Sequence, residues 1–307
     1  MFDRSQIPLA ADRIAGHVRK TPVIEVRHRA QALNLKLECM QVSGTFKARG
    51  AFNRLLGAKS ELLKAGVVAA SGGYHGIAVA YAARSLGIAA HIFVPTTSSQ
   101  AKLDKLRTLG ANLQVIGNQY SEALAASEQF IAQSGALSSH AYDQAETLAG
   151  QGTLGLEWQV QSPQLDTVLV AVGGGGLIGG IAAWYDNRVK VVAVESFDCP
   201  SLNSALAAGQ PVNVSVGGIA ADSLGARQVG KLMFPIALSS IAQSLLVGDA
   251  EIIQAQRWLW NELRIASEPG GATALAAVLS GRYQAAAGER VGVLICGANV
   301  DPLDLRN

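Results

Sequence analysis

Residues 42–52 read VSGTFKARGAF and set Lys47 after a turn of small residues and before a helix-like run. Near a helix N-terminus the positive end of the helix dipole disfavours a charged amine. A lowered pKa is what a lysine needs in order to act as a nucleophile. Most isolated lysines are ordinary surface residues, so Lys47 is a candidate nucleophile that needs support from other segments.

Two glycine-rich loops supply such segments. Residues 71–76 read SGGYHG, and residues 170–183 read VAVGGGGLIGGIAA. Each loop lies between an apolar run typical of a strand and an Ala-rich run typical of a helix. A loop of this kind presents backbone N–H groups and a helix N-terminus to an anion. The sequence therefore predicts two anion-binding loops beside a lysine.

The second loop also fits a dinucleotide-binding fingerprint. Gly174, Gly176 and Gly179 have the GxGxxG spacing, and Glu195 follows about 20 residues later, as the acidic ribose partner would. Two features oppose an NAD-dependent dehydrogenase. Four contiguous glycines form a nest for one phosphate, and three strand–helix units precede this loop, whereas the fingerprint usually opens a domain.

The elements that must position these residues alternate along the chain. Short apolar strands are followed by longer Ala-rich helices, and many strands are apolar on both faces, which is typical of parallel sheets in α/β proteins. A long helix is predicted over 250–265. Strands are predicted at 65–70, 89–95, 111–117, 166–172, 189–196 and 290–297.

Bulk composition narrows the class of protein. The chain has 307 residues, 49% hydrophobic and 16% charged, with a net charge of +2, so it is globular and has no basic footprint for nucleic acid. Its three cysteines form no CxxC pair, which favours a reducing cytoplasm. The charged N-terminus lacks a signal-peptide core. Residues 167–185 carry no charge but contain six glycines, which argues against a membrane span.

In order and spacing, eight segments resemble one family, the fold-type II pyridoxal phosphate (PLP) enzymes of the serine/threonine dehydratase and serine racemase group. The resemblance runs nearly end to end and implies two three-layer α/β domains with mostly parallel sheets, like tryptophan synthase β. It implies a larger PLP-binding domain of residues 1–64 and 142–307 and a smaller substrate-loop domain of 65–141. The segments are KTPVIE (20–25), SGTFKARGA (43–51), SGGYHG (71–76), GQGTLGLE (150–157), VGGGGLIGG (172–180), VESF (194–197), SEPGGA (267–272) and CGANVD (296–301).

The resemblance also implies roles for individual residues. Lys47 would form the Schiff base with PLP and move the Cα proton, and Phe46 would pack beside the ring. Cys296 would contact the pyridine nitrogen. The cofactor phosphate would bind backbone N–H groups of Gly173, Gly174, Gly175, Gly176 and Leu177. The substrate carboxylate and the 3′-oxygen of PLP would face the loop of Ser71, Gly72, Gly73, Tyr74 and His75.

The residue types favour β-elimination. A thiol such as Cys296 is a poor acid and cannot keep the pyridine nitrogen protonated as a carboxylate would. The ring is then a weaker electron sink, which suits loss of a β-hydroxyl from serine, threonine, phenylserine or 3-hydroxyaspartate to give a 2-oxo acid and ammonia. Racemases of the family carry a serine where this chain has Gly72, so racemisation is disfavoured. β-Replacement, and a binding protein without activity, remain alternatives.

The resemblance implies two further features. Glu195, Cys199 and Ser201 stand where the family places a cation, and a single carboxylate there favours K⁺ over Mg²⁺. Family members are commonly dimers, so a homodimer is expected. The chain ends at CGANVDPLDLRN, so control by a C-terminal module is not expected.

Two features depart from the family pattern. The run QALNLKLECMQ before the lysine is several residues short, which leaves the first strand or its loop open. Tyr74 replaces the asparagine that usually bonds the 3′-oxygen. Tyr74 could swing out, reach around and donate its O–H, or crowd the ring; we expect the first or the third, with impaired or altered activity relative to an asparagine version. The loop at 217–226, GGIAADSLGA, is expected to line the side-chain end of the site.

Overall fold

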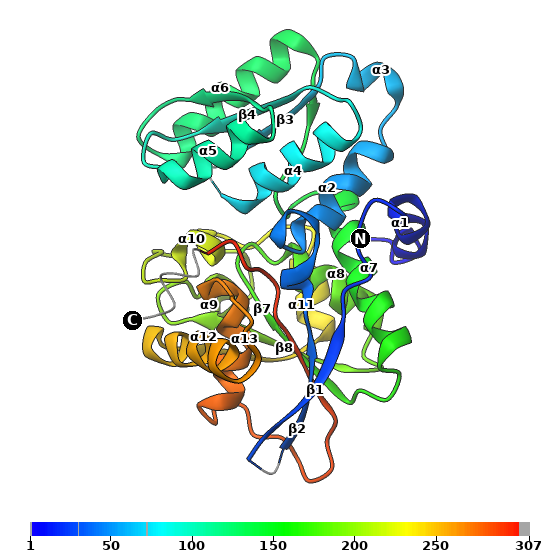
Figure 1. The fold of residues 1–307 in the computed structure, drawn as a ribbon, viewed down its shortest axis with the longest axis vertical. Coiled ribbons are helices and arrows are strands. Elements are labelled where there is room, and N and C mark those ends of the chain that lie inside the picture. The colour runs from blue at the N-terminus through cyan, green and yellow to red at the C-terminus, as the bar shows by residue number, and fades with distance from the viewer. Residues whose placement is uncertain (1, 30, 72, 301–307) are drawn as a thin grey trace.

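A computed structural model describes residues 2–29, 31–71 and 73–300. It contains a six-stranded sheet in the order β1-β2-β10-β7-β8-β9 and a four-stranded sheet in the order β5-β4-β3-β6, which we call the large sheet and the small sheet (Figure 1). Every pairing is parallel except the β1–β2 hairpin. The strands are β1 (Val23–His28), β2 (Gln31–Lys36), β3 (Val67–Ala70), β4 (Ala90–Val94), β5 (Asn112–Val115), β6 (Leu137–Ser138), β7 (Thr167–Ala171), β8 (Lys190–Ser196), β9 (Ile241–Val247) and β10 (Val291–Leu294).

Helices cover both faces of each sheet, giving three layers twice (Figure 1). In the small sheet Val67 and Ala69 pack toward one hydrophobic core and Val68 toward another, as the period of two in a strand requires. The helices are α1 (Gln6–Ile14), α2 (Lys47–Leu56), α3 (Ser60–Leu63), α4 (Tyr74–Ser85), α5 (Gln100–Thr108), α6 (Tyr120–Ser134), α7 (Ala145–Gln161), α8 (Gly176–Tyr185), α9 (Ser201–Ala208), α10 (Ala221–Leu224), α11 (Phe234–Ser240), α12 (Asp249–Leu263) and α13 (Pro269–Leu279), with 3₁₀ turns η1 (Glu38–Met40) and η2 (Val42–Gly44).

Because most strands of the large sheet are parallel, the predicted site residues follow strand ends at one edge of that sheet. Strands β2, β7 and β10 run in parallel, so their carboxyl ends lie at the same edge. The chain leaves β2 toward Lys47, leaves β7 toward the glycine run, and leaves β10 toward Cys296. The small sheet contributes the loop after β3, which leads into α4. This is the edge at which open parallel sheets bind ligands.

The predicted strands and the long helix are present. The short run at 31–41 nonetheless contains β2, which pairs with β1 just before it. Strand β9 was not predicted, because its sequence IAQSLLV alternates weakly; of its residues only Val247 is fully buried. Helix α2 packs into the core of the small sheet through Ala48, Ala51, Phe52 and Leu55, although the predicted boundary at residue 64 places it with the larger domain. No helix within the described ranges has the length and apolar character of a membrane span.

Candidate active site

Lys47 begins helix α2, as the sequence predicted. Thr45 accepts a hydrogen bond from the Lys47 backbone N–H over 3.1 Å, and the Phe46 N–H donates to the Cys296 carbonyl over 3.2 Å. The turn before the lysine has left-handed φ angles, +64° at Ser43 and +80° at Gly44. A Cβ at Gly44 would also lie 2.8 Å from Oδ1 of Asn299. These contacts hold the turn before Lys47 and the start of α2 against the end of β10.

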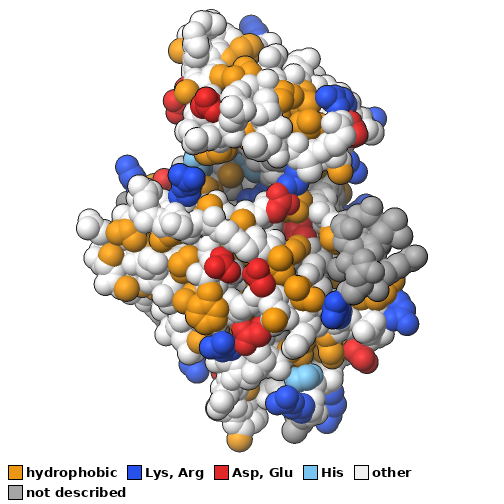
Figure 2. Space-filling model, turned by 90° about the vertical axis from the view of Figure 1, so that its left-hand side faces the viewer, with side chains coloured by type: hydrophobic (Ala, Val, Ile, Leu, Met, Phe, Trp, Pro, Cys, Tyr) orange, Lys and Arg blue, Asp and Glu red, His pale blue; other side chains and the backbone are white. Residues whose placement is uncertain are grey.

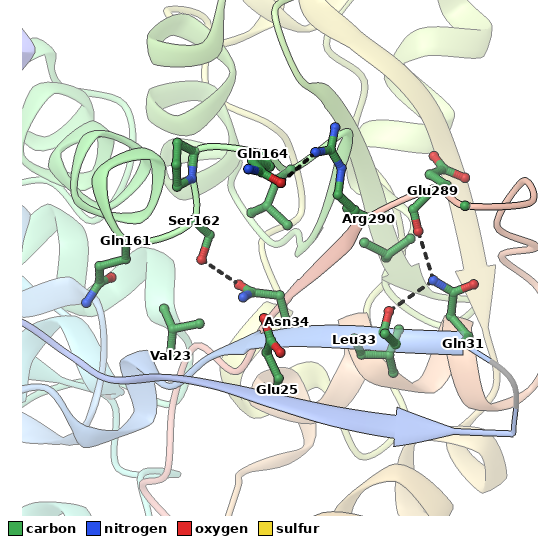
Figure 3. Close-up of a pocket in the computed structure, with 15 residues that line it drawn as sticks. Val23, Glu25, Gln31, Leu33, Asn34, Gln161, Ser162, Gln164, Glu289 and Arg290 are labelled. Carbon is green, nitrogen blue, oxygen red and sulfur yellow. Dashed lines mark hydrogen bonds between the residues drawn. The ribbon is translucent and has the colours of Figure 1, made fainter.

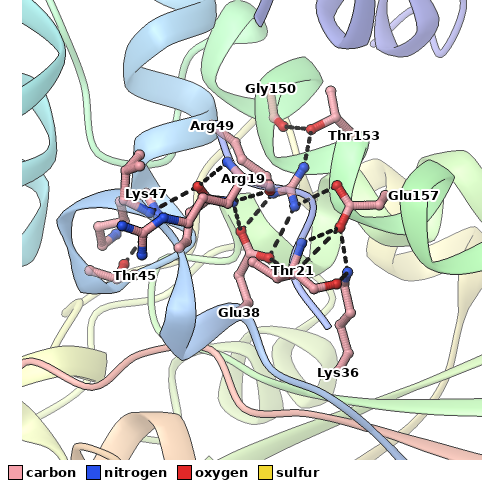
Figure 4. A network of polar contacts seen from close by, with 12 residues as sticks. Arg19, Thr21, Lys36, Glu38, Thr45, Lys47, Arg49, Gly150, Thr153 and Glu157 are labelled. Carbon is pink, nitrogen blue, oxygen red and sulfur yellow. Dashed lines mark hydrogen bonds and ion pairs between the residues drawn. The ribbon is translucent and has the colours of Figure 1, made fainter. Parts of the chain in front are cut away.

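Behind Lys47, a buried ionic cluster anchors α2 (Figure 4). We call Lys36, Glu38, Arg49 and Glu157 the rear cluster. Arg49 Nε donates to Glu38 over 2.6 Å and its Nη2 donates to Glu157 over 2.9 Å, while Lys36 Nζ pairs with Glu157. The side chains of Glu38 and Lys36 are wholly buried, so breaking one pair would leave a buried charge without its partner. The cluster joins β2, η1, α2 and α7.

The glycine run forms the start of α8. Gly175 has a φ of +86°, which favours glycine, and caps the helix. A Cβ on Gly174 would overlap the Tyr142 ring at 2.2 Å, and one on Gly176 would lie 2.8 Å from the Tyr142 Cα. Side chains are therefore excluded at Gly174 and Gly176. Backbone N–H groups and the N-terminus of α8 line the cavity there, as an anion requires.

One pocket brings most of the predicted residues together. Its lining includes Phe46, Lys47, Tyr74, Gly173, Gly174, Gly175, Gly176, Leu177 and Cys296. Figure 2 shows a hollow between the part of the molecule built on the small sheet and the part built on the large sheet. A larger cleft of about 630 Å³ beside the β1–β2 hairpin shares no lining residue with this pocket; it is lined largely by polar side chains such as Asn34, Gln161 and Arg290 (Figure 3).

Glu268 also lines the pocket, and sequence reasoning did not single it out. The motif SEPGGA was noted, but a glutamate before a proline gave no separate signal. Burial raises the pKa of Glu268 to about 7, and its Oε2 accepts a hydrogen bond from the Asn299 N–H over 2.9 Å. Tyr142, which also lines the pocket, was likewise not predicted, whereas Ser223 belongs to the loop at 217–226 that was expected to line the site.

The pocket lowers the pKa of its lysine and keeps its thiol neutral. Burial lowers the pKa of Lys47 to about 8, while Cys296 and Glu268 oppose that shift. Burial is thus the main cause of the lowered Lys47 pKa, whereas the sequence had suggested the helix dipole. Nζ of Lys47 lies 4.8 Å from the Phe46 ring centroid, and no ion pair joins it to a carboxylate among the described residues. Burial, followed by Glu268, raises the pKa of Cys296 far above its usual value.

The loop after β3 approaches the pocket from the small sheet. The Ser71 hydroxyl accepts a hydrogen bond from the Gly73 N–H over 3.3 Å. Nε2 of His75 lies 3.0 Å from the Ser139 carbonyl, and burial, with Lys47 nearby, lowers the pKa of His75 to about 3. His75 is thus neutral at pH 7 and packs inside the fold. Gly72 lies outside the described residues, so its predicted role stays a prediction.

Tyr74 does not swing out of the site. Its side chain is buried and begins α4, and its hydroxyl donates to Asp222 over 2.9 Å and lies 3.2 Å from the Asn299 carbonyl. The ring lines the pocket while the hydroxyl is engaged by groups of the opposite wall. The expectation that the phenol leaves the site is therefore wrong, and its hydroxyl has partners within the chain.

Glu195 has another set of partners at the predicted cation site. Its carboxylate accepts hydrogen bonds from the Leu202 N–H over 2.8 Å and the Asn203 N–H over 2.7 Å, at the start of α9, and burial raises its pKa to about 7. Ser201 donates to the Gly173 carbonyl, and Cys199 donates to the Gly217 carbonyl. No group of three or more His, Cys, Asp or Glu suited to a metal occurs in the described part of the chain. The cation stays a prediction.

Comparison with known proteins identifies the family. The model described as "Pyridoxal-phosphate dependent enzyme" matches residues 14–297. The chain belongs to this family. It is 35% identical over 306 residues to phenylserine dehydratase of Ralstonia pickettii, covering 97% of the chain and 94% of that relative. It is 35% identical to L-threonine ammonia-lyase of Geobacter sulfurreducens, covering 98% and 76% respectively.

The solved structures agree with this family. Maize serine racemase superposes with a TM-score of 0.94 at 32% identity, covering 99% of this chain and 95% of that one. The fold is PLP fold type II, with two sheets and mostly parallel strands. The dinucleotide-binding alternative is therefore rejected, and Glu195 accordingly binds the start of α9 instead of facing a ribose.

The pocket fits PLP in three respects. A partly buried lysine with a lowered pKa is available for a covalent link. The glycine run, where a Cβ at Gly174 or Gly176 would collide with Tyr142, offers backbone N–H groups for a phosphate. Cys296 offers an uncharged contact at the end of β10. These residues come from three separate strand ends, which explains why only the folded chain forms the site.

Proposed function

We propose that the protein catalyses PLP-dependent β-elimination of a β-hydroxy amino acid to a 2-oxo acid and ammonia, as an ammonia-lyase. When bound, PLP withdraws electrons from the Cα of the amino acid and so makes that proton acidic. Lys47 would hold the cofactor and then take the Cα proton at Nζ. The backbone N–H groups of Gly173, Gly174, Gly175, Gly176 and Leu177 would hold the phosphate.

The observation that carries the proposal is Cys296. Its buried thiol lies near the carboxyl group of Glu268, and its pKa is raised, so it remains uncharged at pH 7. A neutral thiol cannot hold a proton on the pyridine nitrogen by charge, so the bound ring would be a modest electron sink. That favours elimination, where the leaving group departs as the proton is removed, over reactions that need a long-lived carbanion.

The substrate would bind between the loop after β3 and the loop at 217–226. The N-terminus of α4, with Ser71, Gly72 and Gly73, would meet the substrate carboxylate. The opposite wall contains Glu268 and, beyond Ser223, Asp222. Because a second substrate carboxylate would lie near the buried Glu268, we propose a neutral β-hydroxy amino acid, serine, threonine or phenylserine, over 3-hydroxyaspartate. The curated relatives named above act on phenylserine and threonine, which supports this choice.

Release of ammonia and 2-oxo acid from purified protein reconstituted with PLP tests the proposal. The panel is L-serine, L-threonine, L-threo-phenylserine and L-threo-3-hydroxyaspartate, with Lys47→Ala as the inactive control. We expect elimination with at least one neutral substrate and weaker turnover of 3-hydroxyaspartate. A holoprotein that shows the absorbance of bound PLP but releases no 2-oxo acid from any of the four would contradict it.

A racemase is the second candidate, because serine racemases are among the similar structures. Position 72, where racemases of the family carry a serine, is a glycine and offers no proton, and His75 is buried and neutral, so we rank the racemase second. Chiral analysis of serine recovered after partial turnover separates the two reactions. Accumulation of D-serine faster than pyruvate would favour the racemase.

Three expectations remain part of the proposal. The protein would work in the cytoplasm as a homodimer, which light scattering of the purified protein tests. A monovalent cation would bind near Glu195, Cys199 and Ser201, and activity in KCl compared with tetramethylammonium chloride tests it. The smaller domain would comprise residues 65–141, and limited proteolysis at its boundaries tests that division.

A further inference from the structure

Three side chains meet at the front of the pocket. The Tyr74 hydroxyl, at the start of α4, donates to Oδ2 of Asp222 on α10 over 2.9 Å. Nζ of Lys102, on α5, forms an ion pair with Oδ1 of the same carboxylate. The same Lys102 ammonium lies 5.2 Å from the Tyr74 ring centroid, within the range of a cation–π contact. We call Tyr74, Lys102 and Asp222 the front clamp.

The front clamp joins two parts of the molecule. Tyr74 and Lys102 belong to helices that pack on the small sheet, whereas Asp222 belongs to α10, which packs against α13 of the large sheet. The hydroxyl of Tyr74 also lies 3.2 Å from the Asn299 carbonyl, beyond the end of β10. In Figure 1, α4 and α5 lie above α10 across the boundary between the two parts. The contacts that Tyr74 and Lys102 make with Asp222, and that Tyr74 makes with Asn299, therefore cross that boundary.

The clamp also adjoins the reaction site. The Tyr74 ring lines the same pocket as Lys47, and so do Ser223 and Leu224, which follow Asp222 in the chain. Tyr74 is buried, the Lys102 side chain is 14% exposed, and the Asp222 side chain is 55% exposed. The contacts thus extend from the pocket wall to solvent, as expected for residues at the entrance, or mouth, of the pocket.

We propose that Tyr74, Lys102 and Asp222 act as a positioning clamp that closes the mouth of the site and controls the access of PLP and of the amino acid to Lys47. The part that concerns the amino acid rests on the proposed function. Because Asp222 is half exposed, water can replace its partners when the clamp opens, so its carboxylate is not left as a buried charge. Tyr74 thereby acts through Asp222 and holds the two walls together.

The first test uses PLP alone and needs no turnover. The apoprotein is mixed with PLP, and the association rate constant is followed by the absorbance of the bound cofactor for wild type, Tyr74→Phe, Asp222→Asn and the double variant. If the clamp limits access, each single variant should associate about fivefold faster, as expected for the loss of one hydrogen bond of ordinary net strength at a partly exposed site. The double variant should be slower than the product of the two single effects predicts, because both changes weaken the same Tyr74–Asp222 contact.

Matched controls come from the same helices. Tyr81→Phe removes a hydroxyl from α4 beside Phe52, and Asp104→Asn removes an exposed carboxylate from α5. Neither should change the PLP association rate. Unchanged or slower association in Tyr74→Phe, or effects of the two single variants that multiply in the double variant, would overturn the clamp. Circular dichroism and urea unfolding of each variant verify that the fold is retained.

The second test concerns the amino acid. With a substrate that turns over, Tyr74→Phe and Lys102→Met should change KM about fivefold while kcat changes less than twofold, because the clamp controls access and not the proton transfer. An equal loss in kcat with KM unchanged would show that Tyr74 acts in the chemical step, contrary to the proposal. If no amino acid turns over, the proposed function fails, but the PLP association rates still decide whether the clamp exists.

Discussion

The two charged clusters on either side of Lys47 differ in burial and therefore in what they can do. In the rear cluster, the side chains of Glu38 and Arg49 are 0% and 2% exposed. In the front clamp, Asp222 is 55% exposed. A buried pair cannot be exchanged for water without a large penalty, whereas an exposed pair can. We therefore expect the base of α2 to be rigid and the mouth of the pocket to be mobile.

The most severe change removes the group that both clusters surround. Lys47→Ala should lower turnover by about a thousandfold or more, because the side chain that would hold PLP and accept the proton is lost. It should also abolish the absorbance change that borohydride causes in the reconstituted protein. Lys105→Ala, on the exposed surface of α5, is the control and should keep full activity. Normal turnover in Lys47→Ala would refute the site.

The rear cluster is tested by Arg49→Met, which leaves Glu38 and Glu157 without their shared cation. We expect a loss of about 3–5 kcal/mol in the free energy of unfolding, because buried carboxylates lose their partner. Arg54→Met, on the same helix, breaks a more exposed pair with Glu146 and should cost less than about 1 kcal/mol. Urea unfolding measures both. Equal losses would show that burial does not distinguish the rear cluster from a surface pair.

The glycine run is tested by Gly176→Ala. The added Cβ would lie 2.8 Å from the Tyr142 Cα and must displace the loop before α7. PLP affinity, measured by titration of the apoprotein, should fall by about tenfold or more, as the misplacement of a phosphate contact predicts. Gly217→Ala, where a Cβ meets nothing within 4 Å, should leave affinity unchanged. The prediction fails if the two variants bind PLP alike.

The smallest expected effect comes from removing the charge of Glu268, which lies near Lys47 in the pocket wall. Only the neutral amine attacks PLP, so the association rate should rise with pH and level off above the Lys47 pKa of about 8. The Glu268 carboxylate, with Cys296, raises that pKa against the effect of burial. Glu268→Gln should therefore shift the midpoint of the rate profile to lower pH, while Glu262→Gln on the exposed face of α12 should not. A shift to higher pH would contradict the assigned electrostatics.

Local patterns were sufficient for much of the fold and for part of the site. The apolar runs at 65–70 and 166–172 predicted β3 and β7, because their continuous hydrophobicity matches strands buried on both faces. The position of Lys47 at a helix start followed from its neighbours. Strand β9 could not be predicted, because its pairing with β8 and not its own composition stabilises it.

These local patterns could not predict contacts between residues that are far apart in the sequence. Glu268 lies opposite Lys47 only because α13 packs on the large sheet, and the Tyr74 hydroxyl meets Asp222 from 148 residues away. Sequence reasoning compared Tyr74 with an asparagine and considered only the cofactor as its partner. The structure instead supplies a carboxylate on the opposite wall.

The sequence by itself determined the family, the lysine, the glycine run and the thiol, because each depends on residue types at short, ordered spacings. Tertiary structure decided that burial lowers the pKa of Lys47, that Glu195 binds the start of α9, and that Tyr74 joins the two parts of the molecule. These three outcomes depend on desolvation and on hydrogen bonds, both of which are set by which distant segments pack together.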